Sequence, residues 1–142
     1  MSESNKMIVR AFADAGNRND LEAFDTLLAP VFLRHCEATP EIAVTSCAEF
    51  KQFYRDTANT FPDQRMTLDT LIAEGDRVAF WGTFSGTQEG PMGSFPPTGR
   101  RLESEIAGMF RIEAGKIAEL WVTWDNLSGF VQLGLFPPPE AE

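Results

Sequence analysis

The sequence predicts a single-domain α+β fold in which helices come first and a run of antiparallel strands follows. Apolar residues recur at helical spacing in the first part of the chain and alternate with polar residues from residue 64 onward. Turn signals separate the alternating stretches, as expected for antiparallel strands. The chain has 142 residues, of which 43% are hydrophobic, and this suits one domain spanning residues 1–142. We therefore expect the helices to pack on one face of a curved sheet.

Two helices are expected before the first strand. The first is marked by apolar residues at helical spacing, namely Ile8, Val9, Phe12 and Ala15. Gly16 offers a stop for this helix. Asn19 is a predicted N-cap of the second helix, because Glu22 stands three residues later as a capping-box partner, and Pro30 ends that helix.

A short strand and a third helix follow. The strand covers residues 31–36 and carries His35 near its end. Ser46 and Glu49 form a second capping box, which predicts a helix that closes at residues 61–62. One face of this helix is largely aromatic, with Phe50, Phe53, Tyr54 and Thr57 at helical spacing.

The second half of the chain has the period of two that is typical of strands. Residues 64–70 alternate, the turn at residues 74–76 follows, and residues 77–88 are the predicted hairpin partner. A loop rich in glycine and proline covers residues 90–99.

Two more strands and a short helix complete the predicted fold. The strands cover residues 100–112 and 116–124 and are joined by a turn that contains a glycine. Asp125 then begins a short helix that Gly134 caps, and the prolines at 137–139 mark a frayed tail.

Charge and cysteine content exclude several classes of partner. The formal charge of −9 repels phosphate backbones and anionic membranes, so we expect no nucleic-acid or membrane partner. Cys36 and Cys47 lack the spacing of a disulfide framework, and with one histidine in the chain they predict no zinc site. No apolar run suits a signal peptide or a membrane span, so we expect a cytoplasmic protein.

Six short motifs stand in order along nearly the whole chain. They are GNRNDL at 16–21, APVFLRH at 29–35, FPD at 61–63, EGDRVA at 74–79, PPTGR at 96–100, and GKIAELW at 115–121 with WD at 124–125. Together they resemble the SnoaL-like polyketide cyclases of the NTF2-like superfamily. The resemblance implies an NTF2-like cone, with a curved antiparallel sheet wrapped around the helices and an apolar pocket. It also implies a homodimer or homotetramer formed through the outer face of the sheet.

The resemblance implies acid/base chemistry without a cofactor on a hydrophobic, polyketide-like carbonyl compound. Such chemistry needs a dry pocket and one carboxylate with a raised pKa. Asp125 matches the aspartate that follows the last strand in the family and serves there as acid/base, and His35 matches the first-strand histidine. The alternatives are that Asp125 only caps the last helix and that His35 bonds a backbone carbonyl.

Four aromatic residues are candidates for the wall of the implied pocket: Phe32, Tyr54, Trp81 and Trp121. The alternative for each is a place in the core. Trp121 shares a face with Asp125 if the strand stays extended. Many relatives have Arg-Trp where this chain has Trp81-Gly82, and a shift by one position flips the tryptophan to the other face of the strand.

One departure from the family keeps several functions open. Cyclases of the family usually pair the aspartate with a histidine on a late strand, whereas this chain has none after His35. The first hypothesis is therefore a cyclase or isomerase, with an epoxide hydrolase or hydroxylase as a variant. The others are a non-catalytic small-molecule binding protein and a fold whose main property is oligomerisation. No phosphate loop, metal cluster or flavin motif stands in the sequence, so no cofactor is implied.

Overall fold

Helices and strands follow one another in the predicted order. The computed structural model describes residues 2–136, and the predicted frayed tail at 137–139 lies outside this part. The elements are α1 (Ser2–Asn17), the 3₁₀ turn η1 (Leu21–Ala23), α2 (Phe24–Leu27), β1 (Leu28–His35), α3 (Cys47–Thr60), β2 (Arg65–Glu74), β3 (Arg77–Thr87), β4 (Arg101–Glu113), β5 (Lys116–Trp124) and α4 (Asn126–Gln132). This arrangement confirms the α+β prediction. No helix within residues 2–136 is both long and apolar enough to cross a membrane.

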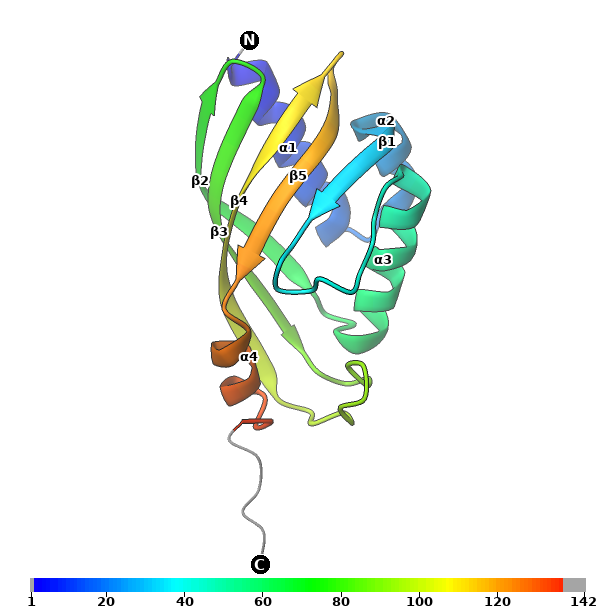
Figure 1. Cartoon of the computed structure of the whole chain (residues 1–142), viewed down its shortest axis with the longest axis vertical. Helices are drawn as coiled ribbons and strands as arrows, with labels where there is room; N and C mark the ends of the chain where they lie inside the picture. Colours follow the sequence, from blue (N-terminus) through cyan, green and yellow to red (C-terminus); the bar gives the residue numbers. More distant parts are fainter. Residues whose placement is uncertain (1, 137–142) are drawn as a thin grey trace, which may run out of the picture.

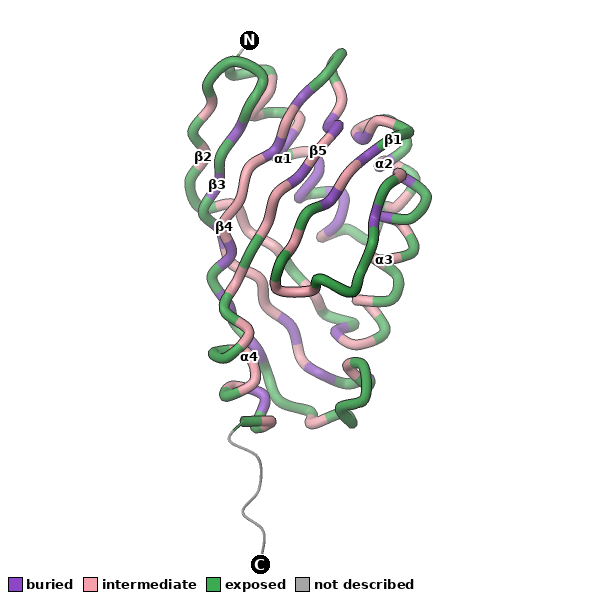
Figure 2. The backbone as a smooth tube through the Cα atoms, viewed as in Figure 1, coloured by how far each residue is buried: buried purple, intermediate pink, exposed green. Residues whose placement is uncertain are grey.

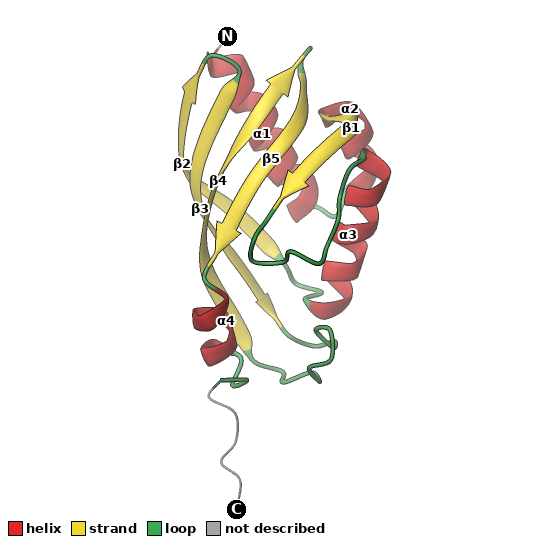
Figure 3. Cartoon of the chain, in the orientation of Figure 1, coloured by secondary structure: helices red, strands yellow, loops and turns green. Residues whose placement is uncertain are grey.

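The strands form one curved sheet in the order β1-β5-β4-β3-β2 (Figure 3). Strands β2 to β5 pair antiparallel with their neighbours, whereas β1 runs parallel to β5. Helix α1 packs along the inner face of the sheet, and α3 packs beside β1 (Figure 1). The first strand in the chain is thus bonded to the last, and this closes one side of a cone.

Phenylalanine rings fill the narrow part of the cone. Phe12 of α1 lies 5.4 Å from Phe24 and 5.5 Å from Phe110 of β4, measured between ring centroids. Phe32 of β1 is fully buried and lies 5.3 Å from Phe50 of α3. Figure 2 shows buried segments along β1 and β5 and where α1 packs on the sheet. These edge-to-face and tilted pairs add to the stabilisation from burying apolar area.

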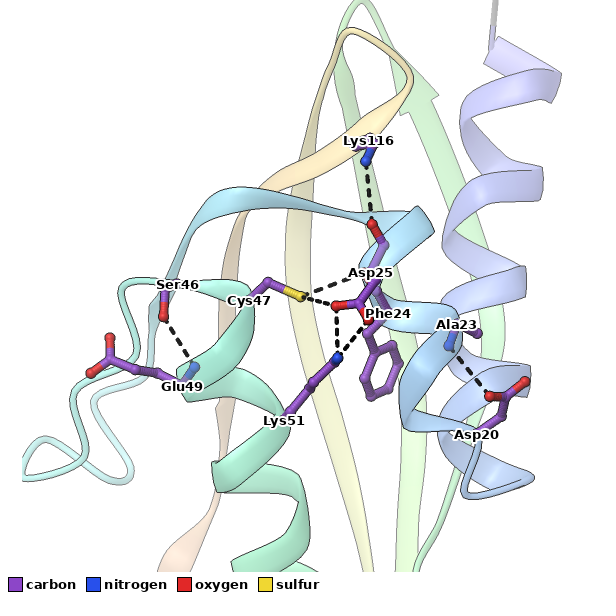
Figure 4. Close-up of polar contacts among 9 residues, drawn as sticks. All are labelled: Asp20, Ala23, Phe24, Asp25, Ser46, Cys47, Glu49, Lys51 and Lys116. Carbon is purple, nitrogen blue, oxygen red and sulfur yellow. Dashed lines mark hydrogen bonds and ion pairs between the residues drawn. The ribbon is translucent and has the colours of Figure 1, made fainter.

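The helix N-termini differ from the prediction at one position. Asn19 has a φ of 57°, so it turns the chain after α1 in the left-handed region and does not cap. Asp20 caps instead, and its side chain accepts a hydrogen bond from the Ala23 amide (Figure 4). The N-cap at Ser46 is confirmed, since its hydroxyl accepts from the Glu49 amide at 3.0 Å. Pro30 does not end a helix, because it lies within β1.

The short helix α2 is tied to the elements around it by Asp25. Lys51 of α3 donates to the Asp25 carboxylate at 2.7 Å, and Lys116 donates to the Asp25 carbonyl (Figure 4). The hydrogen bond from Lys51 lowers the pKa of Asp25. The neighbouring Cys47 thiol is buried, which raises its pKa and keeps it protonated.

Gly108 in β4 permits a close approach between strands, and this generates a stability prediction. A Cβ atom there would lie 2.0 Å from the carbonyl oxygen of Trp121 and 2.9 Å from the Phe80 ring. We expect Gly108→Ala to lower the free energy of unfolding by about 2–3 kcal/mol, because the backbone must move. Urea denaturation measures this change.

Gly129 in α4 is the matched control for that substitution. A Cβ at Gly129 meets only Leu102 at 3.6 Å, an ordinary contact. We expect Gly129→Ala to leave stability unchanged or to raise it by about 0.5–1 kcal/mol, since alanine favours helix. Equal stability of the Gly108→Ala variant and the wild type would contradict the close approach.

Candidate functional site

A cavity of about 740 Å³ lies inside the cone. The inner face of β3, β4 and β5 forms one wall, and α1, α3 and α4 supply the others. Its lining is largely apolar and aromatic, and it includes Phe53, Phe61, Phe84, Ile106, Val122 and Trp124. Cavities of about 300–1,000 Å³ with such walls are the usual sites for small organic ligands.

Strand alternation explains which side chains reach the cavity. In β4, Leu102, Ile106 and Phe110 are buried and line it. In β5, Val122 and Trp124 line it as well. Because successive side chains point to opposite faces, the intervening residues, such as Glu103 and Glu105 of β4 and Trp121 of β5, lie on the outer surface of the sheet.

Most polar side chains of the inner wall bond to the protein's own backbone. Asn17 donates to the Met66 carbonyl at 2.7 Å and accepts from the Met66 amide at 2.8 Å. Tyr54 donates its hydroxyl proton to the Gly16 carbonyl at 2.5 Å, and Ser104 donates to the carbonyl of Glu105. Burial raises the pKa of Tyr54 to about 12, so its hydroxyl stays protonated at neutral pH.

Arg34 of β1 differs from these groups because it brings a charge to the cavity wall. The residue is 9% exposed, and its guanidinium carbon lies 4.2 Å from the centroid of the Phe53 ring. Desolvation lowers its pKa, but an arginine remains charged at any pH at which proteins fold. Nη1 donates to the Thr39 hydroxyl at 3.4 Å, and no carboxylate within residues 2–136 forms an ion pair with it.

Asp125 stands between the end of β5 and the start of α4, at the rim of the cavity, and its side chain is not part of the cavity wall. Its Oδ1 accepts hydrogen bonds from the amides of Leu127 at 2.9 Å and Ser128 at 3.3 Å, so it is the N-cap of α4. The side chain is exposed, although Trp124 and Asn126 on either side of it line the cavity. The capping role is therefore present in the structure, and a catalytic role requires a ligand that extends to the rim.

His35 and two of the four candidate aromatic residues lie on the outer face of the sheet. The His35 ring stacks on Trp121 with 5.3 Å between centroids, and its Nε2 lies 2.5 Å from a Glu119 carboxylate oxygen. Trp81 is 51% exposed and pairs with Ala107 across the strands. Of the remaining two candidates, Tyr54 lines the cavity, and Phe32 is packed in the core behind it.

Sequence reasoning missed Arg34, which lies next to Trp124 on the cavity wall. The Arg34 guanidinium carbon lies 5.8 Å from the centroid of the Trp124 ring, so this contact links β1 to β5. The signal for Arg34 was present in the sequence, because Phe32 was a predicted inward residue and Arg34 shares its face at a spacing of two. His35, at a spacing of three, then faces outward.

The ionic cluster on the outer face generates a pH prediction. Burial acts to raise the pKa of Glu119, but the hydrogen bonds that its carboxylate accepts from His35 and Arg111 outweigh burial and hold that pKa below its usual value of 4.5. A carboxyl whose folded pKa is depressed adds stability above the unfolded pKa and loses it as the pH falls through the folded one.

We expect the free energy of unfolding of Glu119→Gln to fall less than that of the wild type between about pH 5 and pH 3. Denaturant titrations at a series of pH values measure the two slopes. Glu105→Gln is the control, since Glu105 lies on the outer face of β4 without an ion pair in the described part of the chain. Equal slopes for the wild type and Glu119→Gln would contradict the prediction.

Comparisons with known proteins agree with this geometry. TsrD from Streptomyces laurentii is similar at 31% identity and a TM-score of 0.84, over 96% of this chain and 98% of that one. AclR, a candidate hydroxylase from Streptomyces galilaeus, is similar at 26% identity and a TM-score of 0.82, over 99% and 87% of the two chains. IdmH, a candidate polyketide cyclase from Streptomyces antibioticus, is similar at 29% identity and a TM-score of 0.81, over 92% and 98%.

The family comparison covers most of the chain. No curated protein matches this sequence. The model of the SnoaL-like polyketide cyclase family matches residues 6–133. The neighbours by structure have the NTF2-like fold, with the curved sheet and inner helices described above. By sequence and by fold, the chain belongs to the SnoaL-like polyketide cyclase family.

Proposed function

We propose that the protein binds a hydrophobic carbonyl compound of the polyketide type and promotes its cyclisation or isomerisation without a cofactor. The apolar cavity of about 740 Å³ is the observation that carries the proposal. Such a wall holds a flexible chain in a folded conformation and excludes water, which brings reacting carbons together and strengthens electrostatic effects. The similarity to IdmH, a candidate polyketide cyclase, favours the same class of compound.

Asp125 is the proposed base. Both cap bonds go to Oδ1, so Oδ2 is left available at the rim among the described residues. A ligand that reaches from the cavity to the rim would cover this carboxylate and displace water from it. Loss of water favours the neutral acid and makes the carboxylate a stronger base for an acidic C–H bond. His35 has no part in this proposal, because it lies on the outer face.

A second candidate function is ligand binding without turnover. It is favoured by the inner wall, where the polar side chains Asn17, Tyr54 and Ser104 already bond backbone atoms. A binding protein needs an apolar cavity with one or two polar contacts and no base. Epoxide opening or hydroxylation would use the same cavity and stays open as a variant of the enzymatic hypothesis.

Replacing Asp125 separates turnover from binding. We expect the wild type to accelerate exchange of the acidic C–H protons of an aromatic 1,3-diketone with deuterium, followed by NMR. Asp125→Asn should slow the catalysed exchange by about 10²-fold or more, because the base is lost. Ligand affinity and stability should change little, since asparagine caps a helix as well as aspartate does.

Asp20→Asn is the matched control for that experiment. Asp20 caps η1 in the same way, through a hydrogen bond from the Ala23 amide, but it lies away from the cavity. We expect it to exchange protons at the wild-type rate. Full exchange activity in Asp125→Asn would remove the base assignment, and tight binding without any exchange in the wild type would favour the binding function.

We also infer that a second copy of the chain covers the outer face of the sheet. Four residues of this face pair directly in one row across the strands, namely Ile72, Ala79, Met109 and Trp121. Ile72 is 67% exposed and Trp81, in the next row, is 51% exposed. Large apolar side chains gathered on one sheet face are typical of interfaces between subunits.

The oligomeric state tests this interface. We expect the wild type to be a dimer or larger by light scattering, and Trp81→Glu to shift it toward monomer, because a charge would be buried without a partner. Met7→Glu is the control, as Met7 is 70% exposed on α1, away from the sheet face. A wild type that stays monomeric at all concentrations would refute the interface.

A further inference from the structure

We propose that the ligand of the cavity carries a planar oxyanion and that Arg34 is its counter-ion. The proposal rests on the proposed function only in that a ligand occupies the cavity; it adds the charge of that ligand. A carboxylate and the enolate of a 1,3-diketone share the required chemistry, which is two oxygen atoms that share one negative charge in one plane.

Among the described residues, Arg34 lacks the carboxylate partner that comparable cations possess. Lys51 has the Asp25 carboxylate at 2.6 Å, and Arg111 has Glu119 at 3.0 Å. Arg34 is more deeply buried, yet no carboxylate within residues 2–136 pairs with it. The chain contains 21 acidic residues, so carboxylates are plentiful. A buried cation without an anion is unfavourable and needs a reason.

The Arg34 guanidinium has more N–H groups than its protein partners use. It has five N–H bonds; Nη1 donates to the Thr39 hydroxyl, and the Cys36 side chain is a further hydrogen-bond partner. No side-chain nitrogen or oxygen atom in the described part of the chain is both inaccessible and without a partner. The unpaired N–H groups therefore face accessible space. Because Arg34 lines the cavity, a ligand in the cavity can reach this residue.

The surrounding side chains hold the Arg34 guanidinium in place before a ligand arrives. Its carbon lies 4.2 Å from the Phe53 centroid and 5.8 Å from the Trp124 ring, so aromatic groups of α3 and β5 flank it. The Trp124 indole donates to Asn126 at 2.8 Å, and Asn126 donates to the Ala38 carbonyl at 2.7 Å. Stacking uses the flat faces of a guanidinium and leaves the N–H edge free to bind an oxyanion with two parallel hydrogen bonds.

Acidic residues at the mouth limit how much negative charge the ligand can carry. Glu41, Glu49 and Asp56 line the cavity and are exposed, with Glu49 bonded to Thr45 and Asp56 to Gln52. Water and salt screen these exposed charges over about 8–10 Å, whereas the attraction to Arg34 acts in an apolar surrounding. The site therefore favours a mostly apolar molecule with a single negative charge.

Two fluorescent probes of the same shape test the proposal. Anthracene-2-carboxylate carries the oxyanion, and anthracene-2-carboxamide replaces it with a neutral group. We expect the wild type to bind the carboxylate about tenfold or more tightly than the amide, because a charge-assisted pair of hydrogen bonds forms only with the anion. Arg34→Met should weaken carboxylate binding by about the same factor and leave amide binding unchanged, since the apolar wall is kept.

Two further variants complete the design. Arg77→Met is the matched control, because Arg77 also lies over a tryptophan, 4.9 Å from Trp121, but on the outer face of the sheet. It should bind both probes as the wild type does. Arg34→Lys should keep part of the preference for the carboxylate, because the charge remains and the two-pronged geometry is lost. If circular dichroism shows that Arg34→Met does not fold, the proposal is tested by the affinities of Arg34→Lys and by the ratio of carboxylate to carboxamide affinity in the wild type.

A third probe distinguishes the two sources of the oxyanion. The ionised form of an aromatic 1,3-diketone absorbs at a longer wavelength than the neutral form. Binding to the wild type should lower the pH at which this band appears if the site stabilises an enolate, and binding to Arg34→Met should not. If the shift is absent and the carboxylate probe is still preferred, the natural ligand carries a carboxylate and not an enolate.

Each remaining outcome has a defined meaning. Equal binding of the two anthracene probes by the wild type, or a carboxylate preference that persists in Arg34→Met, overturns the role of Arg34 and leaves the proposed function standing. Failure of the wild type to bind any of the three probes overturns both, because the cavity then takes up no compound of this class.

Discussion

Every residue of the long strands faces either the helices or the outer surface, because side chains alternate along a β-strand. Because the sheet is curved, side chains on its inner face point toward the cavity and the helices, and those on its other face point to the exterior. Ile106, Val122 and Trp124 contribute to the cavity wall, whereas Trp81 and Trp121 lie on the outer face. The helices then need only to cover the inner face with apolar side chains, and α1 and α3 do so through Phe12 and Phe53. The position of a residue in this alternation decides whether its side chain lies on the inner face or on the outer face of the sheet.

The fold could be predicted from the sequence because the spacing of apolar residues and the residues that cap or end each element are local signals. The strand Lys116–Trp124 and the N-cap at Ser46 occur where the pattern indicated them. The N-cap at Asn19 was wrong by one residue, because α1 runs to Asn17 and the chain must then turn through a residue with positive φ. A capping-box spacing alone does not show which of two neighbouring polar residues will take the left-handed conformation.

The site was less predictable, because a family motif matches residues to positions in the chain but does not show toward which face of the sheet each side chain points. Tyr54 lines the cavity. Phe32 and His35 were both proposed for the site, although their odd spacing puts them on opposite faces of β1. Arg34 shows a different limit. In sequence it resembles any surface arginine, and its lack of a carboxylate becomes visible only once β1 pairs with β5 and carries it beside Trp124. The outer cluster around Glu119 depends on the same pairing.

The parallel pairing of β1 with β5 also has a consequence for biosynthesis. Leu28 pairs with Ile117 and His35 with Trp121, so contacts that close the cone join residues far apart in the chain. Folds rich in such long-range contacts form slowly, because a long loop must close before its contacts stabilise it. Until β5 has been synthesised, β1 has no partner strand and the apolar side chains that β5 covers stay exposed. A chain that ends before β5 would therefore expose apolar surface and an unpaired strand edge, and such species are prone to aggregate.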